Sequence, residues 1–244
     1  MMPRSNGNNQ PGVRGFSVAV GKTEVLHSEL DFSVDHTMPS LFDLTHQHQD
    51  VDSKIAAALE RLSQAFRVLL WEKNKDYNLS PIQIQFLVYL LYHAAEQCTV
   101  GQLAKEFTLT PATVSDAITT LEEKELVSRA RWKDDRRVAF VSLTAEGKKT
   151  ARQLSTWANV IQESIAEFKS TEKVVVMKFL MRLIESLQQA GVITIARMCI
   201  TCKFFQPEAH PNTKAPHHCR LLDKPLANSE LRLDCPEHEM MSVE

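Results

Sequence analysis

Four cysteines near the C-terminal end of the chain are the residues whose type and spacing most directly suggest chemistry. Cys199 and Cys202 form a Cys-x-x-Cys pair, 16 residues separate this pair from Cys219, and 15 more precede Cys235. Thiols clustered in so short a segment are usually metallated or oxidised in cells rather than packed as core side chains. The spacing therefore predicts a metal centre with four thiolate ligands, a number that suits zinc and an iron–sulfur cluster equally well.

The uneven spacing of these cysteines favours an iron–sulfur cluster over zinc. A structural zinc ribbon usually presents two close cysteine pairs, whereas only the first pair is close here. The order Cys-x-x-Cys-x-Phe, then Cys219-Arg220-Leu221-Leu222, then a lone Cys235, resembles the ligand pattern of high-potential iron–sulfur proteins. Apolar residues that could limit solvent access to a cluster follow the same segment: Phe204, Phe205, Leu221, Leu222, Leu226 and Leu231.

Three histidines flank two of the cysteines and offer alternative ligands. His217 and His218 directly precede Cys219, and His238 follows Cys235. We expect them to surround the site or face solvent, with the four cysteines as the ligands. Cys98 stands alone earlier in the chain and is expected to be a packed thiol.

The composition restricts the class of protein to which these residues belong. The chain has 244 residues, of which 43% are apolar, enough for one large or two small domains. Its 28 basic and 30 acidic residues give a net charge of −2, so any nucleic-acid binding must come from a local basic patch. It has no apolar run of about 18 residues and no secretory signal, which predicts a cytoplasmic protein without a membrane span.

Hydrophobic periodicity divides the first part of the chain into an arm and four helices. Residues 1–50 show no sustained period and are expected to be a poorly ordered arm. An apolar stripe from Ile55 to Leu69 then predicts a long helix that starts near Val51. Three further helices are expected to begin at capping sequences, Ser80-Pro81, Thr99-Val100 and Thr110-Pro111. The last of these three has an apolar inward face of Val114, Ile118 and Leu121.

The second part of the pattern is a hairpin followed by two helices. The period drops to two at 126–132 and 138–143, two strand candidates joined by a polar tip. Thr144 is expected to cap one long helix that runs through Leu154 and Trp157 to Phe168. A last helix from about Thr171 is expected to end at Gly191. Two short helices followed by a β-hairpin wing predict a mainly α fold, the winged helix-turn-helix.

Residues 53–190 resemble the MarR family of bacterial transcription regulators. The most specific segment is 135–147, Asp-Arg-Arg-Val-Ala-Phe-Val-Ser-Leu-Thr-Ala-Glu-Gly, which is similar to the family's wing and the following helix start. Residues 121–127 are similar to the family's exit from the recognition helix. The resemblance implies a homodimer, held by the first and the last two long helices, that binds a palindromic double-stranded DNA operator.

The candidate DNA contacts lie on the recognition helix and the wing. Thr110, Thr113, Ser115 and Thr119 are expected on the outward face of the helix, where they could donate to phosphates or base edges. Arg137 matches the wing arginine that the family places in the minor groove. The net charge of the whole chain does not attract DNA, but the hairpin carries a local basic patch. This patch contains Arg131, Lys133 and Arg136, together with Arg129. The chain departs from the family at Asp116, where an arginine is common.

These features predict three segments and a regulatory function. The segments are the arm (1–50), a DNA-binding and dimerisation domain (51–190) and a four-cysteine module (191–244). The leading hypothesis is a regulator whose operator affinity is modulated by the cysteine-bound metal centre. A second is a regulator with a structural zinc site and a small-molecule effector bound near Trp71, Tyr77 or Trp157. A third is a redox or electron-transfer protein that uses the winged helix for docking, although the chain has no dinucleotide fingerprint, P-loop or nucleophile–base pair and is predicted not to be an enzyme.

Overall fold

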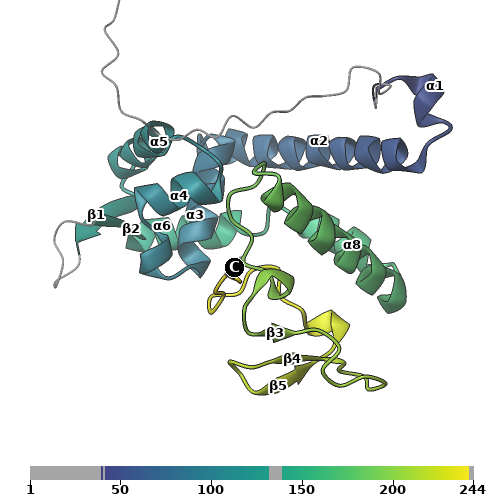
Figure 1. Cartoon of the computed structure of the whole chain (residues 1–244). Coiled ribbons are helices and arrows are strands. Elements are labelled where there is room, and N and C mark those ends of the chain that lie inside the picture. Colours follow the sequence, from purple (N-terminus) through teal and green to yellow (C-terminus); the bar gives the residue numbers. More distant parts are fainter. Residues whose placement is uncertain (1–39, 41, 132–138, 242–244) are drawn as a thin grey trace, which may run out of the picture. The chain divides into compact units, whose positions relative to one another are not determined.

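The computed structural model describes residues 40, 42–131 and 139–241 (Figure 1). The predictions for residues 1–39 and for the tip of the hairpin at 132–138 lie outside the described residues. Among the described residues, six helical segments precede the hairpin: α1 (Leu44–Gln47), α2 (Val51–Tyr77), α3 (Pro81–Tyr92), η1 (Ala95–Gln97), α4 (Val100–Glu106) and α5 (Pro111–Glu123). Helix α1 lies within the predicted arm, and its first turn is stabilised by Asp43, which accepts a hydrogen bond from the Thr45 backbone N–H at 2.9 Å.

The capping sequences fix the starts of α3, α4 and α5, as predicted. Ser80 and Gln83 form a reciprocal capping box at α3, with Pro81 in the first helical turn. Thr99 and Thr110 cap the next two helices by accepting hydrogen bonds from backbone N–H groups three residues ahead. Because each cap satisfies backbone donors that have no partner inside the helix, these starts are determined locally.

The predicted wing is an antiparallel pair, β1 (Val127–Arg131) and β2 (Ala139–Leu143), with Val127 opposite Leu143. The backbone N–H of Val141 donates to the Cys98 carbonyl at 2.8 Å, so β2 is attached to the residues that immediately precede α4. A backbone hydrogen bond thus joins the wing to the helix-turn-helix.

The prediction of one long helix after the wing is wrong, because the structure contains two helices there. They are α6 (Ala145–Leu154) and α7 (Asn159–Ala166), joined by turns at residues 155–158. At the break, the hydroxyls of Ser155 and Thr156 donate to carbonyls three residues earlier, at 2.8 and 2.9 Å. Hydroxyls that bond to nearby carbonyls compete with helix continuation. The final helix, α8 (Ser170–Gln189), ends before Gly191, whose φ of 72° ends the helix as predicted.

Two hydrophobic cores organise the described residues. The larger core is formed mainly by α3–α6 and the wing, with Ile84, Phe86, Leu87, Val114 and Ile118 fully buried. The smaller core packs Met181 of α8 against Ala196, Met198, Leu226 and Leu231 of the C-terminal segment. That segment carries a small antiparallel sheet in the order β3 (Phe205–Gln206), β4 (His217–Cys219) and β5 (Lys224–Leu226). No helix among the described residues has the length and apolar character needed to span a membrane.

Candidate nucleic-acid interface and cysteine site

Helix α5 presents a polar face outward, as the sequence predicts. Thr110, Thr113 and Thr119 are exposed and Ser115 is half-buried, whereas Val114, Ile118 and Leu121 on the other side are completely buried. The hydroxyls are partly engaged within the helix. Thr110 Oγ1 lies 2.9 Å from Thr113 Oγ1, and Thr119 Oγ1 donates to the Ser115 carbonyl at 2.9 Å. Thr110 therefore has a structural role as the N-cap in addition to its position on the outward face.

An arginine from the wing lies across this face of α5. The Arg129 guanidinium donates to Thr119 Oγ1 at 3.2 Å and lies 3.4 Å from Ser115 Oγ. Glu122 orients it through a 3.0 Å ion pair and also accepts the Arg129 backbone N–H at 3.1 Å. Arg129 thereby places a positive charge beside α5, a helix that contains no lysine or arginine of its own.

The remaining candidate DNA residues divide between described and undescribed parts of the chain. Arg131 is exposed at the end of β1, and Asp116 is exposed on α5. Lys133, Arg136 and Arg137 lie outside the described residues, so their predicted contacts stay predictions.

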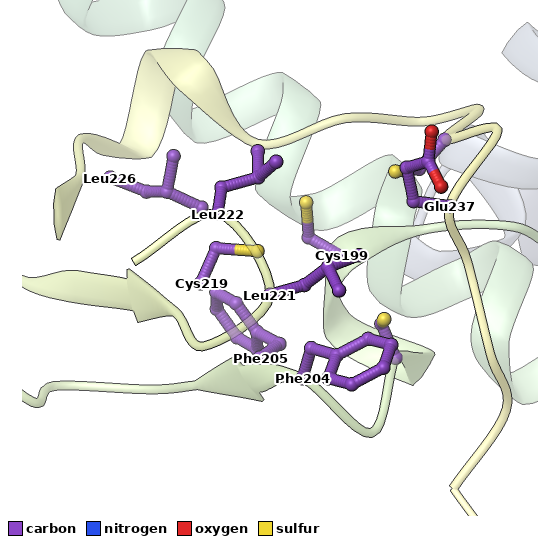
Figure 2. Close-up of a pocket in the computed structure, with 10 residues that line it drawn as sticks. Cys199, Phe204, Phe205, Cys219, Leu221, Leu222, Leu226 and Glu237 are labelled. Carbon is purple, nitrogen blue, oxygen red and sulfur yellow. The ribbon is translucent and has the colours of Figure 1, made fainter. Parts of the chain in front are cut away.

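All four cysteines of the C-terminal segment line a single small cavity of about 30 Å³. They come from a 3-10 turn (Cys199–Thr201), the residue after it, the end of β4 and the loop that follows η3 (Asn228–Glu230). Figure 2 shows Cys199 and Cys219 facing the cavity, with the rings of Phe204 and Phe205 on one side and Leu222 and Leu226 on the other. The apolar residues predicted to shield the site from solvent do line the cavity. The exception is Leu231, which is buried in the neighbouring core.

Hydrogen bonds and burial set the electrostatics of these sulfurs. The Arg232 backbone N–H donates to Cys199 Sγ at 3.1 Å, and the Arg232 side chain donates to Cys235 Sγ at 3.6 Å. Burial raises the pKa of the Cys199 thiol; the Arg232 backbone opposes this, and the charges of the other three cysteines raise the pKa further. A bound cation would reverse this repulsion, because metal ligation stabilises thiolates.

The three histidines near the cysteines make contacts elsewhere and do not line the cavity. His238 Nε2 lies 2.9 Å from Thr201 Oγ1, His217 contacts Asn228, and His218 contacts His210. Sequence reasoning missed Arg232 and Glu237, which contact the sulfurs or line the cavity. Their proximity to Cys235 in the sequence was the only available signal.

Comparisons with known proteins agree with the winged-helix architecture. A sequence model of the MarR family matches residues 83–139. The transcriptional regulator ZitR of Lactococcus lactis is 29% identical over 146 residues, which cover 57% of this chain and 96% of ZitR. YwaE, an uncharacterized helix-turn-helix transcriptional regulator of Bacillus subtilis, is 30% identical over 131 residues, covering 52% of this chain and 75% of YwaE.

The fold also matches a solved structure. The crystal structure of S. aureus MepR in its DNA-binding conformation aligns with a TM-score of 0.50 and 22% identity, covering 55% of this chain and 98% of MepR. Nearly the whole of ZitR and of MepR is therefore matched by little more than half of this chain. A large part of the chain has no counterpart in either protein.

Proposed function

The chain belongs to the MarR family of DNA-binding transcriptional regulators, and we propose that it is a homodimer whose operator affinity is set by a metal centre on Cys199, Cys202, Cys219 and Cys235. One observation carries the proposal: four thiols, brought from separate segments, meet at one apolar cavity in a chain that also contains a winged helix. As a family member it is a transcriptional regulator and not an enzyme.

The proposed DNA contact uses α5 and the wing. The hydroxyl face of α5 (Thr110, Thr113, Ser115, Thr119) and the cation of Arg129 would face the major groove, where such side chains can bond to base edges or phosphates. Arg131, Lys133, Arg136 and Arg137 would contact the backbone or the minor groove beside it.

The proposed dimer is supported by apolar side chains that the described residues leave uncovered. Leu62, Val68 and Trp71 on α2 are 53–57% exposed, and Val175, Val176 and Phe179 on α8 are 44–69% exposed. Exposed apolar surface along two long helices is typical of an interface. A second copy of the chain would cover it, and two recognition helices would then address a palindromic site.

The donor set fits a metal centre, and its spacing favours an iron–sulfur cluster over one zinc ion. A tetrahedral zinc site needs its ligands within about 2.3 Å of one point. Within the parts of the chain that the structure describes, no group of three Cys, His, Asp or Glu residues is arranged to hold a metal ion, so the thiols would have to approach one another on binding either zinc or a cluster. The four thiols line a small cavity of about 30 Å³, and the preference for a cluster, in which each iron takes one cysteine, comes from the spacing of the cysteines in the sequence. When bound, such a cluster would supply a redox-sensitive state.

The smaller core offers a route from the cysteines to the dimer helices. Cys199 and Cys219 pack against the same core as Met181 and Met177 of α8. Rearrangement of the cysteine segments would therefore change how α8 packs and alter the spacing of the two recognition helices. Because specific binding depends on half-site spacing, this change would alter operator affinity.

Metal analysis of protein purified without oxygen tests the centre first. We expect broad absorbance near 400 nm with matching iron and sulfide, lost in Cys199→Ala and Cys235→Ala dimers. Operator fragments selected from the promoter of the chain's own gene are then titrated with loaded and metal-stripped protein. Equal affinity in the two states, or unchanged regulation in the cysteine variants, would remove the proposed control.

A second candidate is a structural zinc site with a small-molecule effector, and one cavity favours it. A largely apolar cavity of about 630 Å³ lies between α7, α8 and the C-terminal segment, lined by residues that include Phe168, Met177, Leu180 and Leu233. This volume is in the range of small-molecule sites. It is separate from the expected aromatics, since Tyr77 and Trp157 pack against the larger core and Trp71 is exposed. A colourless protein with about one zinc per chain would favour this candidate.

A further inference from the structure

Arg197 lies between the cysteine cavity and the helix-turn-helix, and its side chain is only 12% exposed. Its Nε donates to Asp234 Oδ1 at 2.7 Å, and its Nη2 lies 2.8 Å from Glu106 Oε2, at the C-terminal end of α4. Burial lowers the pKa of the guanidinium, but the hydrogen bond to Asp234 and the charge of Glu106 raise it overall. The guanidinium therefore carries a permanent charge between two carboxylates on different parts of the fold.

The backbone of Arg197 is joined to the cysteine ligands. The Cys235 N–H donates to the Arg197 carbonyl at 2.9 Å, and the Cys199 N–H donates to the Arg232 carbonyl at 3.0 Å. Two backbone hydrogen bonds thus join segments 197–199 and 232–235 beside two of the proposed ligands. Any change that separates these ligands must move Arg197 and Asp234 as well.

Glu106, on the helix-turn-helix side of Arg197, depends on this arginine for its charge balance. Glu106 Oε2 is buried and receives no hydrogen bond of regular geometry from the described residues. A carboxylate oxygen of this kind is stabilised by the nearby cation, and losing that cation leaves a buried charge uncompensated. Helix α4, which ends at Glu106, packs directly on the recognition helix α5 through Leu103 and Ala104.

Asp234 also contacts a second element of the DNA-binding core. Its Oδ2 lies 2.8 Å from His93 Nε2, at the end of α3, and the His93 ring stacks on Tyr89 with centroids 3.6 Å apart. Asp234, directly before Cys235, therefore contacts α3 itself and reaches α4 through Arg197.

We propose that the ion-pair chain Asp234–Arg197–Glu106 transmits the state of the cysteine centre to α4, and through α4 to the recognition helix. The inference rests on the proposed function and adds a route distinct from α8. With the centre intact, the paired segments hold Arg197 against Glu106. Without it, the segments separate, Arg197 leaves Glu106, and α4 and α5 lose their fixed position.

The test compares operator affinity of metal-loaded and metal-stripped protein in the full-length chain. Glu106→Gln preserves the shape of the side chain and removes its charge, so the loaded variant should keep the iron, sulfide and spectrum of the parent. The ratio of the operator Kd of stripped protein to that of loaded protein should move toward one by at least about fivefold. Fivefold is the lower end of the range typical of coupling between two sites. Arg197→Gln should have the same effect, and the double variant should be no worse than either single variant, because both remove one interaction.

The matched control is Glu239→Gln. Glu239 pairs with Lys203 within the cysteine segment and makes no ion pair with the winged helix among the described residues. This variant should keep the parental ratio. A parental ratio in both Glu106→Gln and Arg197→Gln would overturn the link through α4 while leaving the metal-controlled regulator intact. A parent without any difference between states would instead overturn the proposed function, and this inference with it.

Discussion

Arg129 supplies positive charge to the outward face of the recognition helix from a neighbouring element. Its guanidinium bonds to Thr119 and lies beside Ser115, while Glu122 holds it in place. A helix with Asp116 at an outward position would otherwise present hydroxyls and a negative charge to DNA. At the residue scale, we expect this arginine, although paired with Glu122, to offset the departure from the family pattern when DNA binds.

Replacing this arginine should weaken DNA binding. Arg129→Ala removes a cation that can bond to a base or phosphate, which is worth about 1–3 kcal/mol, or about fivefold to 150-fold in Kd. Arg129→Lys should be intermediate, since it keeps the charge and loses the planar fork. Fluorescence anisotropy with operator DNA measures the change. Arg67→Ala, at an exposed position on α2, is the control, and an Arg129→Ala affinity equal to that of the control would contradict the assignment.

Cys98 should be unreactive in the folded protein. It is 2% exposed, and burial together with the nearby Glu96 raises the pKa of its thiol to about 11. Roughly one thousandth of it is therefore ionised at pH 8, and only the thiolate attacks thiol reagents. After metal removal at pH 8, we expect a maleimide to modify the partly exposed Cys219 and Cys235 quickly and Cys98 only after unfolding.

The same shift predicts a pH effect on stability. The thiol ionises more readily in the unfolded chain than in the folded one, so the free energy of unfolding should fall as pH rises from about 9 toward about 11. Cys98→Ser should reduce this slope. Modification of Cys98 in the folded protein as fast as that of Cys219 and Cys235 would contradict the raised pKa on which both expectations rest.

At the scale of elements, the junction between the wing and α6 depends on a close backbone approach. Thr144 N–H donates to the Leu126 carbonyl, and Gly147 lies against the same carbonyl. A Cβ added to Gly147 would lie 1.8 Å from Leu126 O, and this neighbour is backbone that cannot rotate away. The glycine therefore fixes how tightly α6 follows the wing.

Two glycine substitutions should consequently change stability in opposite directions. Gly147→Ala should lower the free energy of unfolding by about 3 kcal/mol or more, because the clash displaces backbone. Gly101→Ala is the matched comparison, since its Cβ would meet nothing within 4 Å; alanine should raise stability by about 0.5–1 kcal/mol through its helix preference. Urea unfolding at one protein concentration measures both. Equal effects of the two substitutions would show that the contact at Leu126 is unimportant.

At the scale of the whole molecule, the described residues leave two faces of long helices uncovered. The middle of α2 and the outward side of α8 expose large apolar side chains, although both helices contribute to cores on their other sides. Such surfaces destabilise an isolated chain in water and favour association. The proposed dimer gives these faces a role in positioning the two recognition helices.

Charges introduced on these faces should dissociate the dimer. Leu62→Glu and Phe179→Glu would each bury an unpaired carboxylate in the proposed interface, and each should raise the dissociation constant at least about tenfold. Sedimentation velocity over a concentration series measures the change. Tyr92→Glu, at a 67% exposed position at the end of α3, should leave the dimer intact. A monomeric parent, or variants as dimeric as the parent, would place the interface elsewhere.

The sequence by itself determined the elements whose signals are local. Capping residues such as Ser80 and Thr110 fixed helix starts, and the apolar spacing of Val114, Ile118 and Leu121 identified the buried face of α5. The cysteine spacing indicated a shared site. The long helix after Thr144 was predicted wrongly because the apolar period continues across hydroxyl groups that interrupt the backbone hydrogen bonds.

Only the tertiary structure decided which distant residues meet. It brought the four cysteines to one cavity, laid Arg129 across α5, and placed Asp234 beside His93, 141 positions away. No periodicity or cap encodes these contacts, because they depend on how two cores pack and on which polar groups that packing buries together. Partly buried charges such as Arg197 and Glu106 then have to pair where packing has placed them. The connection between the cysteines and the DNA-binding helices is therefore a property of the folded chain alone.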